Sequence, residues 1–195
     1  MHSGTLFVVS TPIGNLGDLG ERAREVLKRV DLIAAEDTRR TGQLLAVIGS
    51  SVRTISLHEH NEEKRIPEVI AGLRTGTCYA LVSDAGTPLI SDPGYRLLSA
   101  VREADLPVSP IPGPCAMVAA LSVAGLPTDR FCFEGFLPTK GRGRRERLAQ
   151  IASETRTTVI YEAPHRLLTL LEELEQQCGA ERPVQVAREL TKRHE

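Results

Sequence analysis

The chain has 195 residues, and its 24 lysines and arginines nearly balance 25 aspartates and glutamates, which gives a net charge of −1 at pH 7. This balance excludes a protein that binds nucleic acid through its overall charge, so a polyanionic partner would require a local basic patch. The hydrophobic content of 41% is sufficient for a packed core. No apolar run approaches the roughly 20 residues that cross a bilayer, so we expect no membrane-spanning helix.

The four cysteines are scattered along the chain without a CxxC pair. The N-terminus lacks the charged and apolar regions of a signal peptide. Together these features predict reduced cysteines in a cytoplasmic protein, without a disulfide framework. The spacing also predicts no zinc or other metal site.

Short apolar segments alternate with amphipathic segments over the first 112 residues. The predicted strands are 5–10, 31–35, 52–57, 78–82 and 106–109, and the predicted helices are 19–29, about 41–48, 62–73 and 95–101. Because parallel strands need crossover connections, this alternation predicts a parallel-type sheet with helices on both faces, in one α/β domain over residues 1–112. Asp18, Asp37 and Asp92 each precede a helix and are candidate N-caps. Pro107 indicates that its strand lies at an edge or begins there.

The second half of the chain follows a stiff joint at Pro112–Pro114, which predicts a domain boundary. Predicted strands at 131–136, 157–161 and 184–187 then alternate with predicted helices at 116–123 and 167–177. The chain ends on a charged segment soon after the last of these strands. We therefore predict a second, mixed α/β domain over residues 113–195, and we expect it to be incomplete.

The segment Ser83–Gly94 separates a predicted buried strand from a helix and holds two glycines and two prolines. Glycine allows a ligand to approach the main chain closely, and proline stiffens the loop around it. Ligands of open α/β sheets bind at the carboxyl ends of the strands, so this segment is a candidate binding loop. The alternative is a tight turn that binds nothing.

The composition of the loops constrains the ligand. They contain neither the GxGxxG pattern nor a GxxxxGK[ST] phosphate loop, and they pair glycine with proline instead. Since proline has no N–H, such loops bind phosphate poorly. Acidic residues at the ends of predicted strands would stabilise a cation. They are Glu36, Asp37, Asp84, Asp92, Glu134 and Glu162. The pattern favours a flat small molecule that is partly apolar or cationic over a nucleotide triphosphate.

Three further segments carry candidate chemistry. Glu162, His165 and Arg166 place an acid, an imidazole and a guanidinium in one short loop, although a capped helix start with exposed charges is the alternative. His58 follows a predicted strand, where a polar loop residue is the alternative. The basic run Lys140–Arg147 is either a solvated helix face or a phosphate contact, and its four arginines favour phosphate.

Seven motifs occur in order along the chain, namely Ser10–Leu16, Glu36–Arg39, Ser83–Pro88, Pro112–Pro114, Gly135–Pro138, Tyr161–Arg166 and Arg188–Lys192. With these motifs the chain resembles the ribosomal small subunit methyltransferase I type of the tetrapyrrole methylase superfamily. The resemblance implies a two-domain class III methyltransferase fold, a homodimer, and S-adenosylmethionine in the cleft between the domains. The implied reaction is methylation of the ribose 2′-oxygen of a cytidine in the decoding region of 16S ribosomal RNA, within the small ribosomal subunit.

The resemblance also implies cofactor-binding residues. Carried over by position, they are Pro12, Gly86, Thr87, Pro88, Ile90, Cys115 and Ala116 in the first domain and its joint, and Tyr161, Glu162, Ala187 and Arg188 in the second. The sulfonium of the cofactor is a cation, which agrees with the acidic residues at the strand ends.

A ribose hydroxyl is a poor nucleophile, so a base or a cation beside it would assist the reaction. Our candidate catalytic residues are Glu162 and His165, followed by Asp37 and His58. The candidate RNA contacts are Lys140, Arg142, Arg144, Arg145 and Arg166. Two other functions stay open: methylation of a tetrapyrrole carbon, as elsewhere in the superfamily, and a truncated, non-catalytic fragment that binds a ligand or RNA.

Overall fold

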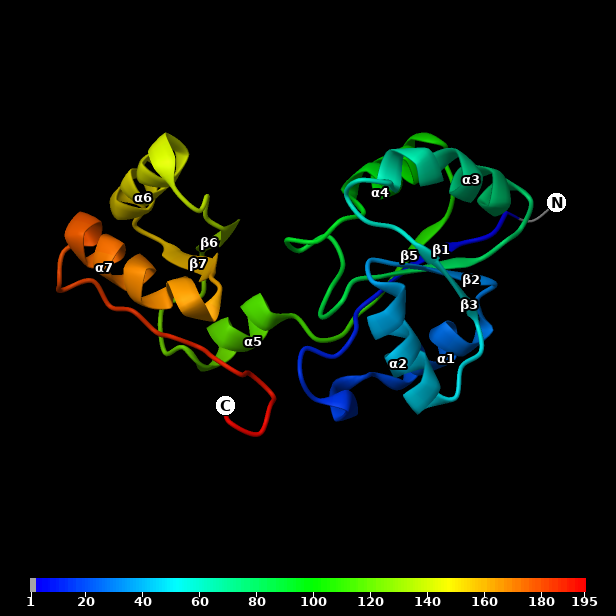
Figure 1. The fold of residues 1–195 in the computed structure, drawn as a ribbon, viewed down its shortest axis with the longest axis horizontal. Coiled ribbons are helices and arrows are strands. Elements are labelled where there is room, and N and C mark those ends of the chain that lie inside the picture. Colours follow the sequence, from blue (N-terminus) through cyan, green and yellow to red (C-terminus); the bar gives the residue numbers. More distant parts are fainter. Residues whose placement is uncertain (1–2) are drawn as a thin grey trace. The chain divides into compact units, whose positions relative to one another are not determined.

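The computed structural model describes residues 3–195 (Figure 1). They form two compact units, one with the residues up to Ala116 together with Glu189–Glu195, and one with Met117–Arg188. The predicted division placed Glu189–Glu195 in the second domain, whereas in the structure this segment packs with the first unit. No helix in the described part of the chain is both long and apolar enough to cross a membrane.

The first unit is built on a five-stranded parallel sheet with the order β3-β2-β4-β1-β5. The strands are β1 (Leu6–Val9), β2 (Leu32–Ala35), β3 (Arg53–Ser56), β4 (Tyr79–Val82) and β5 (Val108–Ile111). The helices between them are α1 (Glu21–Arg29), α2 (Thr38–Ile48), α3 (Glu62–Arg74) and α4 (Tyr95–Glu103). The predicted parallel sheet is confirmed, and the carboxyl ends of its strands lie at one edge.

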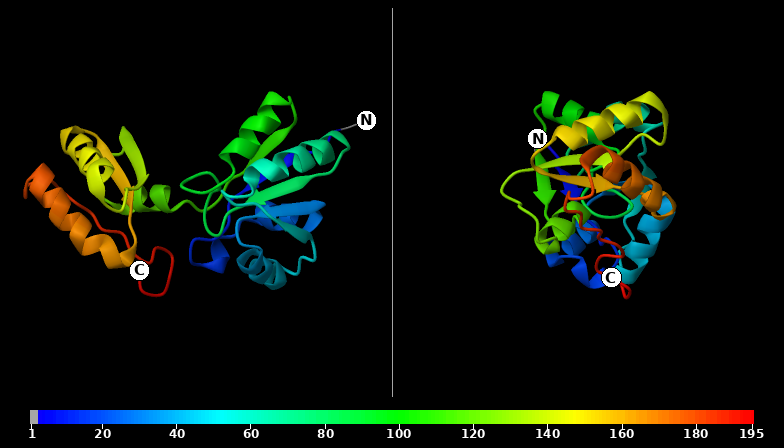
Figure 2. Two further views of the ribbon diagram at one scale, coloured as in Figure 1. Left: turned by 45° about the horizontal axis from the view of Figure 1, so that its top comes forward. Right: turned by 90° about the vertical axis from the view of Figure 1, so that its left-hand side faces the viewer.

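Different helices cover the two faces of this sheet, as Figure 2 shows. Successive side chains of a strand point to opposite faces, so each strand contributes to two cores. In one core Ile33 packs with Leu27 of α1 and Leu45 of α2. In the other, Leu81 packs with Leu97 of α4. The predicted helices on both faces are therefore confirmed.

Capping residues account for two of the helix boundaries. The side chain of Asp37 accepts a backbone N–H and begins α2, as predicted. Gly49, with a φ of 70°, ends the same helix in the left-handed conformation. The expectation that Asp18 caps the first helix is wrong, because Asp18 belongs to the 3₁₀ helix η1 (Leu16–Asp18) and Gly20 is the N-cap of α1.

Strand β5 lies at the edge of the sheet, as Pro107 indicates. It begins at Val108, after that proline, and runs two residues beyond the predicted end. It contains Pro110, which an edge strand tolerates because one side of its backbone has no partner.

The second unit has a smaller sheet, in which β6 (Phe131–Phe136) and β7 (Thr157–Tyr161) pair in parallel. Its helices are α5 (Ala116–Val123), α6 (Gly141–Ser153), the 3₁₀ helix η2 (Pro164–Arg166) and α7 (Leu167–Cys178). The buried apolar core contains Leu137, Leu148, Ile151 and Leu170. The predicted strand at 184–187 is wrong: those residues pair with neither β6 nor β7 and have no regular structure.

Candidate active site

Three loops rich in proline and glycine meet at the carboxyl ends of the adjacent strands β4, β1 and β5. Thr11, after β1, and Gly86, after β4, exchange two backbone hydrogen bonds of 2.9 and 3.0 Å. The Thr87 hydroxyl donates to the carbonyl oxygen of Pro114, at 3.0 Å, and lies 2.9 Å from the Ser10 hydroxyl. Hydrogen bonds therefore fix the central loop against its neighbours on both sides.

The central loop has a strained backbone. Leu89 and Ser91 have φ values of 73° and 65°, in the left-handed region that disfavours residues with a Cβ. Gly86 has a φ of 82°, and a Cβ on it would lie 3.3 Å from Cγ2 of Ile13. Strain of this kind persists only where surrounding contacts hold it, and it is concentrated at ligand-binding and catalytic sites.

Four of the acidic residues predicted at strand ends lie together at this edge. A carboxylate oxygen of Glu36 accepts the backbone N–H of Asp84, at 3.3 Å, and the Asp84 carboxylate accepts that of Asp37, at 3.1 Å. Arg40 pairs with Asp84 at 3.3 Å. Burial, together with repulsion from Glu36 and Asp84, raises the pKa of Asp92 from 3.8 to about 6. The group carries more negative than positive charge and would stabilise a cation.

Two candidate catalytic residues, Asp37 and His58, lie at the same edge. Asp37 forms an ion pair with Arg39 at 2.9 Å, and hydrogen bonds from Arg39 lower the pKa of Asp37 to about 2. A carboxylate with so low a pKa is a weak base at neutral pH. The Nδ1 atom of His58 is buried and has no hydrogen-bond partner among residues 3–195. Its ring lies 5.9 Å from that of His60.

Glu162, the first catalytic candidate, lies in the second unit between two arginines. Its side chain is 4% exposed, with one carboxylate oxygen 2.6 Å from Arg166 and the other 3.6 Å from Arg144. The backbone N–H of Ala163 also donates to it, at 2.8 Å. These contacts are those of a residue that holds its loop in place. His165, in η2, is exposed.

Arg144 is the most buried member of the basic run, with 5% of its surface exposed. Its Nε and Nη2 atoms donate to the Glu173 carboxylate at 2.8 and 2.6 Å, and Nη1 donates to the carbonyl oxygen of Pro138 at 3.0 Å. A buried guanidinium with these partners presents no surface to a phosphate, so the structure does not support the predicted RNA contact at Arg144. The sequence carried a signal for this role, because Arg144 has helical spacing with Leu148 and Ile151 of the core.

The other predicted RNA contacts differ in how exposed they are and in whether a carboxylate pairs with them. Arg166 is 24% exposed and is paired with Glu162, so it too belongs to the buried charges of this unit. Arg142 is 86% exposed on its side chain and is paired with Glu146 at 2.6 Å. Lys140 and Arg145 are exposed. The exposed cations of the run therefore come from the beginning of α6.

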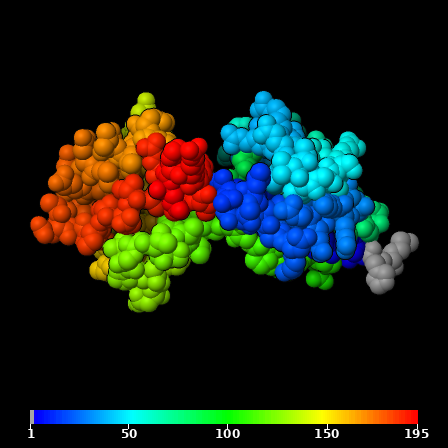
Figure 3. Space-filling model, turned by 90° about the horizontal axis from the view of Figure 1, so that it is seen from below, coloured from blue at the N-terminus to red at the C-terminus, as the bar shows by residue number. Residues whose placement is uncertain are grey.

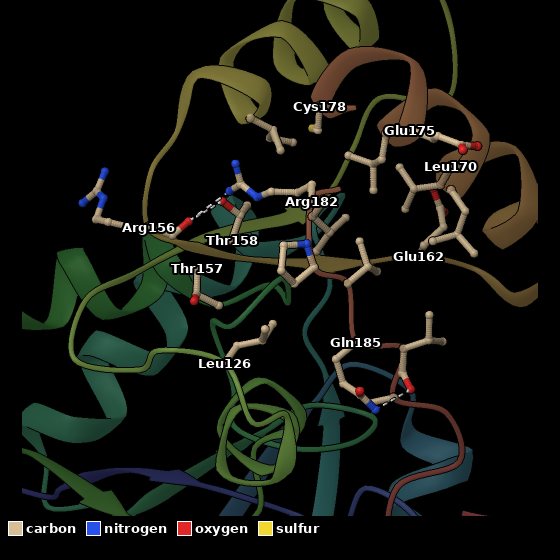
Figure 4. Close-up of a pocket in the computed structure, with 18 of the residues that line it drawn as sticks. Leu126, Arg156, Thr157, Thr158, Glu162, Leu170, Glu175, Cys178, Arg182 and Gln185 are labelled. Carbon is tan, nitrogen blue, oxygen red and sulfur yellow. Dashed lines mark hydrogen bonds between the residues drawn. The ribbon is translucent and has the colours of Figure 1, made fainter. Parts of the chain in front are cut away.

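The second unit contains a cavity of about 760 Å³, shown in Figure 4. Leucines of α7, including Leu170, line one wall, and the irregular segment 183–188 lines another. Glu162 reaches the cavity, and its Oε2 atom has no hydrogen-bond partner within the described residues. Arg182 also lines the cavity and donates to the carbonyl oxygen of Glu154 at 2.9 Å. The lining of the cavity is mostly apolar and includes charged side chains.

The predicted cofactor contacts fall into one set in each unit. In the first unit the set consists of Pro12, Gly86, Thr87, Pro88, Ile90, Cys115 and Ala116, which belong to or directly follow the three joined loops. In the second unit Glu162, Ala187 and Arg188 line the cavity. Tyr161 lies beside Glu162, and its hydroxyl accepts the backbone N–H of Met117 at 3.0 Å. Among residues 3–195 no cluster of histidine, cysteine, aspartate and glutamate could hold a metal ion.

Comparisons with known proteins agree on one family. The family model for tetrapyrrole (corrin/porphyrin) methylases matches residues 5–195. A protein of Escherichia coli named ribosomal RNA small subunit methyltransferase I is 57% identical over 189 residues, which cover 97% of this chain and 66% of that protein. A protein of the same name from Synechocystis sp. is 56% identical over 192 residues, covering 98% of this chain and 69% of that protein.

The solved structures extend the likeness to the fold. The crystal structure of uroporphyrin-III-C-methyltransferase from Thermus thermophilus matches with a TM-score of 0.61 and 21% identity, covering 89% of this chain and 74% of that one. At this identity the likeness concerns the fold alone. The chain spans about two thirds of the length of the curated relatives that it matches.

Proposed function

This chain belongs to the tetrapyrrole methylase family, and from that premise we propose that it is an S-adenosylmethionine-dependent methyltransferase of 16S ribosomal RNA. The proposed acceptor is the ribose 2′-oxygen of a cytidine in the decoding region. The observation that carries the proposal is the name shared by relatives that are more than 50% identical over nearly the whole chain. We also propose that the enzyme is cytoplasmic and forms a homodimer. Light scattering during size-exclusion chromatography would test the dimer.

The chemistry of the first unit fits the proposed cofactor. When bound, S-adenosylmethionine supplies an electrophilic methyl group on a positively charged sulfur. The carboxylates of Glu36, Asp84 and Asp92 supply the negative charge that such a cation requires. The loops around Gly86 present backbone groups at the position where an open α/β sheet binds its ligand. The residues proposed to hold the cofactor are the two sets described above.

The ribose hydroxyl must lose its proton as its oxygen is methylated, so a proton acceptor beside it assists the reaction. Asp37 is a weak base because of its low pKa. Glu162 is engaged by two arginines. His58 has a buried ring nitrogen without a partner, at the carboxyl edge of the sheet. We therefore propose His58 as the residue that accepts the proton, ahead of the exposed His165.

Replacement of His58 tests this assignment. We expect His58→Ala to lower the single-turnover rate of methylation about 100- to 10,000-fold, the range for loss of a general base. The affinity for S-adenosylmethionine, measured by calorimetry, should stay unchanged. The control is His60→Ala, two residues away and exposed. Equal losses in the two variants would contradict a specific role for His58.

The function itself is tested by offering the chain S-adenosylmethionine with three acceptors: small ribosomal subunits, protein-free 16S ribosomal RNA, and a porphyrinogen. Methyl transfer to the ribose of a decoding-region cytidine in either RNA sample would support the proposal. Transfer to the porphyrinogen alone would support the tetrapyrrole alternative. Calorimetry that detects no binding of S-adenosylmethionine would support a non-catalytic fragment.

A further inference from the structure

The segment Glu189–Glu195 packs on the loop that follows β1, within the first unit. Figure 3 shows this red C-terminal segment against the blue N-terminal part of the chain. A Cβ on Gly14 would lie 2.4 Å from Cγ of Lys192 and 3.1 Å from the carbonyl oxygen of Leu190. The aliphatic part of Lys192 therefore crosses directly over the backbone of Gly14, and no residue with a side chain fits there without displacing it.

The backbone of the segment is held in an unfavourable conformation. Glu189 and Thr191 have φ values of 56° and 67°, so two of three successive residues lie in the left-handed region. The backbone N–H of Lys192 donates to the carbonyl oxygen of Glu189, at 2.9 Å, and closes a turn between them. The Thr191 hydroxyl is buried and has no hydrogen-bond partner within residues 3–195. Such costs are typical of segments that position a functional group.

The location of this segment places Lys192 near the proposed cofactor loops. Gly14 is two residues from Pro12, and the neighbouring Ile13 would touch a Cβ on Gly86 of the central loop. Lys192 is 44% exposed on its side chain, and its ammonium group lies 3.2 Å from the Glu189 carboxylate. The stem of this lysine lies against the backbone of Gly14 while its charged end reaches solvent, an arrangement suited to a phosphate.

Most arginines of the basic run already form ion pairs with carboxylates of this chain. Arg142 is paired with Glu146, Arg144 with Glu173, and Arg147 with Glu134. The sequence therefore overestimates how many of these cations are available to RNA. Lys140 and Arg145 stay exposed, and cations elsewhere in the chain would add to them if the substrate is held by its phosphates.

We propose that Lys192, positioned by Gly14, binds a phosphate of the substrate RNA beside the loops that follow β1 and β4. The proposal rests on the proposed function, because RNA is the substrate that supplies the phosphate. The phosphate takes the place of Glu189 as the partner of the ammonium group. Gly14 is a positioning residue in this arrangement, and Lys192 is the residue that touches the substrate.

The test measures binding of an RNA fragment with the decoding region of 16S ribosomal RNA at several salt concentrations. Each phosphate contact contributes about 0.7–0.9 to the slope of log K against log salt. We expect Lys192→Ala to weaken binding and to lower this slope by about one contact, and Lys192→Arg to retain it. The control is Lys28→Ala, an exposed lysine at the end of α1, on the opposite edge of the sheet from the loops.

Gly14→Ala supplies the second half of the test. We expect it to lower the slope as Lys192→Ala does, because its methyl group displaces the lysine. The double variant should lose no more than either single variant, since both remove one contact. Calorimetry should find the affinity of Lys192→Ala for S-adenosylmethionine unchanged.

An unchanged slope for Lys192→Ala, or additive losses in the double variant, would overturn this inference. If the Lys192→Ala variant still bound and methylated the RNA, the proposed function would stand without this inference. A wild-type chain that bound neither RNA nor S-adenosylmethionine would overturn both.

Discussion

Different interactions stabilise the two units of this chain. The first unit has an apolar core on each face of a five-stranded sheet, with fully buried residues such as Leu27, Ile33 and Leu97. The second unit has two strands and a small apolar core, and it buries charged groups beside that core. Apolar burial tolerates local change because it is non-directional, whereas a buried ion pair fails when one partner is lost.

Arg144 is central to the second unit because its contacts join four segments. It binds Glu173 of α7, the carbonyl oxygen of Pro138 before α6, and Glu162 after β7. Its own helix, α6, carries it into the core. We infer that this arginine determines where the Tyr161–Arg166 loop lies, and with it the position of Glu162.

The largest expected effect is therefore that of Arg144→Ala. Removing one partner of a buried ion pair leaves an uncompensated charge, at a cost of about 3–5 kcal/mol. Hydrogen exchange of the backbone amides of β7 and α7 should show a loss of this size in their free energy of opening. Arg142→Ala, on the exposed side of the same helix, should change it by less than about 1 kcal/mol. Similar losses in the two variants would contradict a special role for Arg144.

A second pair of variants compares the apolar cores directly. Leu27→Ala removes a side chain that is fully buried in the first unit, and we expect a loss near the upper end of the range of about 2–5 kcal/mol. Leu148→Ala, in the sparse core of the second unit, should cost near the lower end because its surroundings can relax into the space. Hydrogen exchange of the backbone amides of β2 measures the loss for Leu27→Ala, and that of β6 measures the loss for Leu148→Ala. The reverse order would contradict the comparison.

The smallest expected effect concerns pH and Asp92. The folded chain keeps a proton on Asp92 up to about pH 6, whereas an unfolded aspartate releases it near 3.8. The folded state thus binds more protons between these values, and its stability falls as the pH rises through them. Asp92→Asn should remove this cost and raise stability at pH 7 by about 1 kcal/mol, less than the full shift because solvent screens a half-buried group.

Thermal unfolding at pH 4 and pH 7 measures this effect. The gain from Asp92→Asn should be present at pH 7 and nearly absent at pH 4. Asp18→Asn, at an exposed position of the same unit, is the control for the substitution itself. A gain of equal size at both pH values would indicate a cause other than the proton on Asp92.

Contacts between distant segments account for what sequence reasoning missed. In the basic run, the pattern of charges does not show that Arg144 and Arg147 meet carboxylates from other elements. Asp37 is a local case: it is predicted as a helix cap and as a candidate base, and hydrogen bonds from Arg39, two residues along the chain, hold its pKa too low for the second role. The sequence alone assigns no role to Lys192, because its contact with Gly14 joins residues at opposite ends of the chain.

By itself the sequence determined the alternation of strands and helices, the parallel sheet of the first unit and the loops at its carboxyl edge. These features follow from hydrophobic periodicity and from local proline and glycine chemistry, which act over a few residues. Only the tertiary structure decided which charges are buried and paired, that residues 184–187 form no strand, and that Glu189–Glu195 returns to the first unit. Those outcomes depend on partners from distant parts of the chain, and folding alone brings them within reach.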